Sequence, residues 1–155
     1  MVLKAASEHL TPVTLELGGK SPALVLRDAN IKHSADNIMY SKVLNSGQTC
    51  VATDYVLVDH MIADEFIEAL IQSIKTFYPS FDQYPKLVNE QSYKRIEQLI
   101  VADEKYVVGT VEKNDQARQI KPVILKAAFE DIEVGESMKE EIFGPILPII
   151  TFSQI

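Results

Sequence analysis

Cysteine and tryptophan are the scarcest residues of this sequence, which has one cysteine, Cys50, and no tryptophan among 155 residues. A single cysteine can form neither an internal disulfide nor a multi-cysteine zinc site within one chain. The metal-binding patterns H-E-x-x-H and C-x-x-C are also absent, so we expect no metal site. The reducing cytoplasm is the compartment expected for such a chain.

Basic residues are outnumbered: 15 lysines and arginines stand against 22 acidic residues, with a net charge of −7 and a pI near 4.9. This balance argues against a nucleic acid or an anionic membrane surface as partner. Lys4 and Glu8 interrupt what would be the apolar region of a signal peptide, and no stretch reaches about 18 uninterrupted apolar residues. We therefore expect a small-molecule ligand, with no nucleic-acid or membrane partner.

Glycine is also sparse, and Gly18-Gly19 is the only adjacent pair. The pair matches neither G-x-G-x-x-G nor G-x-x-x-x-G-K-[ST], so neither phosphate-binding fingerprint is present.

With 46% hydrophobic and 24% charged residues, the chain has the composition of one compact globular unit. Its hydrophobic periodicity alternates between strands and helices, which predicts an α/β fold with a mostly parallel sheet flanked by helices. The first half is expected to hold a helix ending at His9, strands over 13–17, 22–26 and 51–59, and helices over 31–43 and 62–77. The second half is expected to hold a connector over 78–89, a helix around 95–100, strands over 106–108, 123–125 and 146–152, and an exposed loop over 112–119.

Cys50 follows the glycine-containing stretch Asn45-Ser46-Gly47-Gln48-Thr49, at an expected helix-to-strand junction. Backbone N–H groups exposed in such a loop can lower the pKa of a thiol and bind an oxyanion. The alternative is that Cys50 is a small buried hydrophobe, as most unpaired cysteines are.

A general base could come from a histidine or a carboxylate. None of the three histidines, His9, His33 and His60, lies in surroundings typical of a Cys-His dyad. Glu16 lies in an apolar alternating pattern just before Gly18-Gly19, where burial would raise its pKa toward a useful value. It could equally be a solvent-facing residue of a strand.

Near the end of the chain, Glu141-Ile142-Phe143-Gly144-Pro145 combines acidic, aromatic and turn-forming residues. This stretch could present a carboxylate and a ring to a ligand, or it could be a surface turn with a buried phenylalanine.

Three segments together resemble the signature segments of the aldehyde dehydrogenase superfamily. They are a glycine segment (residues 15–22, Leu-Glu-Leu-Gly-Gly-Lys-Ser-Pro), a cysteine segment (residues 45–50, Asn-Ser-Gly-Gln-Thr-Cys) and a phenylalanine segment (residues 141–145, Glu-Ile-Phe-Gly-Pro). Their order matches the family pattern, and so does the separation of Glu16 and Cys50, 50 − 16 = 34 positions. The intervening chain resembles the class 3 branch, whose members oxidise medium-chain, aromatic and fatty aldehydes.

The resemblance implies a role for each of five residues. Cys50 would add to the aldehyde carbon, and a thiohemiacetal would pass hydride to NAD or NADP and leave a thioester. Glu16 would activate the hydrolytic water. Gly18 would let the coenzyme approach closely, Glu141 would contact the ribose on its nicotinamide side, and Phe143 would pack against the nicotinamide.

Family members are much longer, so the resemblance also implies a fragment. Residues 1–19 would be the C-terminal remnant of the coenzyme-binding domain, and residues 20–155 a partial catalytic domain. The parent enzyme would be a homo-oligomer using NAD or NADP, which this fragment alone would bind poorly. The alternatives are a catalytically inactive domain that self-associates through exposed sheet edges, and ester hydrolysis through an acyl-Cys50 intermediate.

Overall fold

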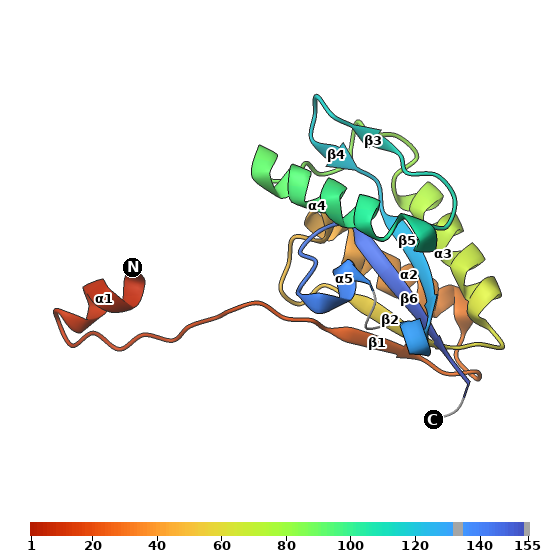
Figure 1. The fold of residues 1–155 in the computed structure, drawn as a ribbon, viewed down its shortest axis with the longest axis horizontal. Helices are drawn as coiled ribbons and strands as arrows, with labels where there is room; N and C mark the ends of the chain where they lie inside the picture. The colour runs from red at the N-terminus through yellow and green to blue at the C-terminus, as the bar shows by residue number, and fades with distance from the viewer. Residues whose placement is uncertain (132–134, 154–155) are drawn as a thin grey trace.

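A four-stranded sheet with the order β1-β2-β6-β5 forms the centre of the molecule (Figure 1). The computed structural model describes residues 1–131 and 135–153. The helices and strands are α1 (Val2–Ser7), β1 (Pro22–Val25), α2 (Ile31–Val43), β2 (Tyr55–Asp59), α3 (Ala63–Phe77), α4 (Glu90–Ala102), β3 (Lys113–Asn114), β4 (Gln119–Ile120), β5 (Val123–Ala128), α5 (Glu136–Lys139) and β6 (Ile146–Phe152). Short 3-10 turns cover Leu44–Gly47, Glu104–Tyr106 and Phe129–Asp131.

All pairings within this sheet are parallel, which confirms the expected fold class. Pro22 of β1 lies opposite Tyr55 of β2, and Val56 of β2 lies opposite Ile149 of β6. β5 pairs with the other edge of β6 over six residues. Because β6 has a strand on each side and helices over both faces, its residues from Ile146 to Ile150 are buried.

Helices cover the two faces of the sheet unequally. α2 and α3 pack on one face through apolar residues at helical spacing, and α4 packs on the other (Figure 1). Successive residues of β5 point to opposite faces, so Ile124 joins the α2–α3 side and Val123 and Leu125 join the α4 side. Two apolar cores therefore share one sheet.

Asparagine caps fix the start of two helices. The side chain of Asn30 accepts the N–H of His33 at 3.0 Å, and that of Asn89 accepts the N–H of Ser92 at 2.8 Å. The helices expected over 31–43 and 62–77 are confirmed, and the helix around 95–100 extends over the whole of α4.

Some expected strands are wrong or too long. Residues 13–17 form no strand, because no partner strand lies beside them among the described residues. Residues 106–108 contain the end of a 3-10 turn and one isolated bridge, between Val107 and Leu125. The strand expected over 51–59 begins only at Tyr55, and the loop expected over 112–119 contains part of the short β3–β4 hairpin.

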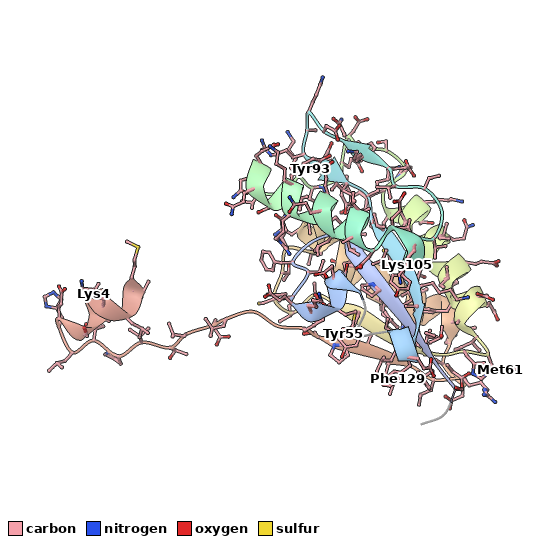
Figure 2. The ribbon with its side chains drawn as sticks, viewed as in Figure 1. Lys4, Tyr55, Met61, Tyr93, Lys105 and Phe129 are labelled. Carbon is pink, nitrogen blue, oxygen red and sulfur yellow. The ribbon has the colours of Figure 1, made fainter. Side chains whose placement is uncertain are left out.

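The N-terminal part of the chain projects from the body (Figure 1). Figure 2 shows Lys4 on this arm, well away from Tyr55 and Tyr93 on the body. Leu15 and Leu17 are exposed here, so the alternating pattern that predicted a strand is not buried against anything the structure describes.

Candidate active site

Cys50 is exposed, in a tight turn between α2 and β2. The N–H of Ala52 donates to the carbonyl of Thr49 at 3.0 Å, which closes the turn. Just before it, Asn45, Ser46 and Gly47 have φ values of 51°, 58° and 73°, a left-handed run that ends the helical path. The alternative of a buried hydrophobic cysteine is therefore wrong.

The side chain of Gln48 holds this turn in place. Its Nε2 donates to the carbonyls of Asn45 and Lys86 at 2.9 and 3.1 Å, and its Oε1 accepts the N–H of Val88 at 2.8 Å. Asn45 in turn donates from its side chain to the carbonyl of Gln48. The cysteine segment is thus tied to the connector before α4.

The three segments that resemble the family signatures meet at glycines. A Cβ on Gly18 would overlap the carboxylate of Glu141, and a Cβ on Gly19 would lie 2.8 Å from the carbonyl oxygen of Cys50. A Cβ on Gly47 would overlap the carbonyl of Gly144. Each contact joins a different pair of segments. Those at Gly19 and Gly47 are made to backbone atoms, so they need a residue without a side chain.

Lys20 and Asp54 hold the start of the phenylalanine segment. The Nζ of Lys20 lies 2.5 Å from Asp54 and also donates to the carbonyls of Ser137 and Glu140. The other carboxylate oxygen of Asp54, which is buried, accepts the N–H of Ile142 at 2.9 Å. A lysine of the glycine segment therefore fixes the backbone next to Glu141.

Two further basic side chains bind carbonyls of the same segment. Arg95 of α4 donates to the carbonyl of Ile142, and Lys42 of α2 donates to that of Gly144 at 3.2 Å. These bonds use the backbone of the segment, while Phe143 itself is 42% exposed, with φ at 46°. The alternative of a buried phenylalanine is wrong.

Asp103, at the end of α4, anchors the short helix that precedes this segment. Its two carboxylate oxygens accept the N–H groups of Glu136 and Ser137, each at 2.8 Å, at the start of α5. The carboxylate is buried, and both bonds go to donors that a helix start leaves unpaired.

Of the five predicted site residues, the structure brings Gly18 and Glu141 together and places Cys50 against Gly19. Phe143 lies between Ile142 and Gly144, whose carbonyls are both bound. Of the two alternatives for Glu16, the buried one is wrong: Glu16 lies on the unpaired arm, is exposed but in no strand, and makes no hydrogen bond or ion pair with a described residue.

The sequence pattern did not single out Lys20, Lys42, Asp54, Arg95 or Asp103. Lys20 and Asp54 do carry a local signal, because each is a charged residue at the end of a stretch that leads into a strand. Lys42, Arg95 and Asp103 lie within or next to helices, where charged residues are ordinary.

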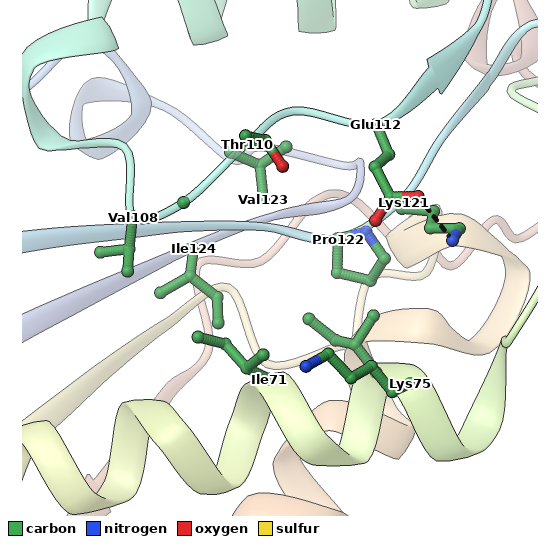
Figure 3. Close-up of a pocket in the computed structure, with 11 residues that line it drawn as sticks. Ile71, Lys75, Val108, Thr110, Glu112, Lys121, Pro122, Val123 and Ile124 are labelled. Carbon is green, nitrogen blue, oxygen red and sulfur yellow. Dashed lines mark hydrogen bonds and ion pairs between the residues drawn. The ribbon is translucent and has the colours of Figure 1, made fainter.

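A separate pocket of about 200 Å³ lies between α3 and the start of β5 (Figure 3). Ile71, Ile74 and Ile124 form its apolar side, and the ion pair between Lys121 and Glu112 stands at its edge. None of the five predicted site residues lines it.

Across residues 1–131 and 135–153, no three side chains of histidine, cysteine, aspartate or glutamate gather as metal ligands. In the same part of the chain, every helix is too short or too polar to cross a membrane.

Known proteins resemble this chain over its full length. The model of the aldehyde dehydrogenase family matches residues 1–155. The 4,4'-diaponeurosporen-aldehyde dehydrogenase of Staphylococcus aureus is 41% identical, over 100% of this chain and 34% of its own length. The dimeric NADP-preferring aldehyde dehydrogenase of Mus musculus is 42% identical, over 97% and 33%.

Solved structures of aldehyde dehydrogenases also resemble this chain. The substrate-bound state of Staphylococcus aureus AldH has a TM-score of 0.87 and 41% identity, covering 99% of this chain and 34% of that one. A putative aldehyde dehydrogenase of Anabaena variabilis has a TM-score of 0.80 and 29% identity, covering 99% and 34%. The chain thus spans about a third of the length of the relatives it matches.

Proposed function

Because this chain belongs to the aldehyde dehydrogenase family, we propose that it is part of an NAD- or NADP-dependent enzyme that oxidises aldehydes to carboxylic acids. One observation carries the proposal. The glycine, cysteine and phenylalanine segments, far apart in the sequence, meet at Gly18, Gly19 and Gly47 around an exposed cysteine.

In this function Cys50 is the nucleophile. Its thiolate adds to the aldehyde carbon, which turns the carbonyl oxygen into an oxyanion, and the backbone N–H of Cys50 serves as one donor to that oxygen. A bound NAD or NADP would supply the hydride acceptor that lets the thiohemiacetal on Cys50 become a thioester. Water then hydrolyses the thioester and frees the thiol.

Glu16 is our candidate for activating that water. Support comes from its place two residues before Gly18, which contacts Glu141. The arm that carries Glu16 is unpaired here, so the base would have to be positioned by parts of the longer protein.

The residues on the nicotinamide side fit a coenzyme. The carboxylate of Glu141 lies against Gly18, where a side chain would otherwise stand, and Phe143 is exposed on a backbone held from both sides. We propose that Glu141 receives the ribose and Phe143 the nicotinamide. We further propose that residues 1–19 complete the coenzyme-binding domain of the parent and that residues 20–155 belong to its catalytic domain.

The expected assembly is a cytoplasmic homo-oligomer, supported by the dimeric state in the name of the mouse relative. This chain alone would bind the coenzyme weakly, because it spans only about a third of the length of its relatives.

The decisive experiment measures NADH and NADPH formation with aliphatic and aromatic aldehydes, for this chain and for the longer protein that contains it. Cys50→Ala is the control in both. We expect turnover by the longer protein that Cys50→Ala abolishes, and little or none by this chain. Turnover unchanged in Cys50→Ala would refute the role of the cysteine.

A second candidate is a non-catalytic domain that self-associates. It is favoured by β1, whose outer edge pairs with no strand of the described chain. Concentration-dependent dimerisation of this chain, without coenzyme binding, would support it. Ester hydrolysis that requires Cys50 but no coenzyme would instead support acyl transfer through the thiol.

A further inference from the structure

We propose that Lys42 is a positioning residue that locks the cysteine segment to the phenylalanine segment. The inference builds on the proposed function, since it concerns the same site, but it assigns a task to a residue that touches neither aldehyde nor coenzyme in that scheme.

The position of Lys42 brings it into contact with both segments. It lies in the last turn of α2, just before the left-handed run that leads to Cys50, and its side chain is 1% exposed. Its Nζ donates to the carbonyl of Gly144. Its stem lies against Gly47, where a Cβ would be 3.2 Å from the Cδ of Lys42.

Gly47 and Gly144 are themselves in contact, because a Cβ on Gly47 would overlap the carbonyl of Gly144. That carbonyl is the one the Lys42 ammonium binds. A single side chain therefore closes the junction between the two segments from the buried side.

Burying an ammonium group at this position costs desolvation free energy. Desolvation lowers the pKa of Lys42 to about 8, against the attraction of Asp54 and Glu141, while Lys20 adds repulsion. A methionine would fill a similar volume without that penalty, but it has no N–H to donate. The feature that only a nitrogen-bearing side chain supplies here is the bond to Gly144.

The bond has a consequence on each side. Gly144 follows Phe143, so fixing its carbonyl fixes the backbone that presents the ring. Gly47 precedes Cys50 by three residues, so holding it keeps the turn and its N–H groups in place around the thiol. Losing the bond should lower the reactivity of the thiol, because the turn that presents the thiol would lose part of its fixed geometry.

Cys50 is the only cysteine, so the rate of alkylation by iodoacetamide at pH 7.5 reports on this thiol alone. We would compare the parent chain with Lys42→Met, Lys42→Gln and the control Lys75→Met, an exposed lysine of α3. Urea unfolding of each variant would accompany the rates.

We expect Lys42→Met to fold and to react about three- to tenfold more slowly, as the loss of one ordering hydrogen bond allows. Lys42→Gln keeps a donor on a slightly shorter side chain and should recover part of the rate. Lys75→Met should match the parent. These rates need neither aldehyde nor coenzyme, so they stand apart from the outcome of the dehydrogenase assay.

Three results would overturn the proposal. Alkylation of Lys42→Met at the parental rate would show that the segments are locked without Lys42. Equal alkylation rates for Lys42→Met and Lys42→Gln would show that the hydrogen bond to Gly144 does not join the two segments. Failure of both variants to fold would make Lys42 a residue of the core and not of the site.

Discussion

At the scale of single residues, Lys42 is unusual because an ionisable amine is buried. Between pH 8 and 10.5 the folded chain keeps this amine neutral while the unfolded chain keeps it protonated, because the folded pKa is about 8 and the ordinary value 10.5. The unfolded state therefore binds more protons in this window, and the free energy of unfolding rises with pH there.

From this follows a pH-dependent prediction. The contribution of Lys42 should grow by on the order of 3 kcal/mol from pH 8 to 10.5, since each unit of pKa shift corresponds to about 1.4 kcal/mol. Urea unfolding of the parent and of Lys42→Met at pH 8 and pH 10.5 would measure it. The other lysines and the tyrosines titrate in both proteins, so their effect cancels in the difference between the two. An identical pH dependence in the two proteins would contradict the prediction.

The turn that carries Cys50 could be predicted from the sequence, because a glycine-containing stretch at the end of a helix is a local feature, whereas the role proposed for Gly18 rested on the family resemblance. The burial of Glu16 could not be judged in this way. An alternating apolar pattern predicts a buried strand only if a partner exists, and the partner is not a local property.

At the scale of elements, α5 is too short to be stable by itself and depends on Asp103. The carboxylate binds the first two N–H groups of the helix, and the segment that carries Glu141 follows directly. The order of the phenylalanine segment thus begins at the end of α4.

Asp103→Asn should disturb this region selectively. Asparagine offers one acceptor oxygen where aspartate offers two, so one buried N–H would lose its partner at a cost of about 1–3 kcal/mol. Hydrogen exchange should become faster over residues 136–142 before it does in α2 or α3. Glu68→Gln on α3 serves as the control, and equal exchange in both variants would show that α5 is held by other contacts.

The helices were predicted more accurately than the strands. Apolar spacing and an asparagine cap mark α2 and α4 within the local sequence. Residues 106–108 are rich in valine and tyrosine, yet they form only one bridge because β6 and not this stretch is the full-length neighbour of β5. The charged side chains that hold the phenylalanine segment could not be predicted either, since Lys20 and Glu140 are 120 positions apart.

At the scale of the whole molecule, the arm and the body are energetically separate. The hydrogen bonds that the structure describes for residues 1–12 join residues of that stretch to one another. The two cores, in contrast, unite the helices with the sheet through residues such as Leu70, which is fully buried.

Removing residues 1–12 should therefore leave the free energy of unfolding within about 0.5 kcal/mol of the parent value. Leu70→Ala is the matched comparison and should lower it by about 2–5 kcal/mol, because it leaves a cavity in the larger core. Both values come from urea unfolding followed by circular dichroism. A large loss of stability on truncation would mean that the arm packs against the body in solution.

The central place of β6 also determines the order in which the protein can fold. β1 and β2 are close in sequence and can pair early, but β2 acquires its second neighbour only when Ile149 reaches Val56. Closing so long a loop costs chain entropy before any contact is gained, and it makes folding slow. Until that moment the edge of β2 stays open and can pair with another chain, so aggregation competes with folding at the same edge that later becomes the middle of the sheet.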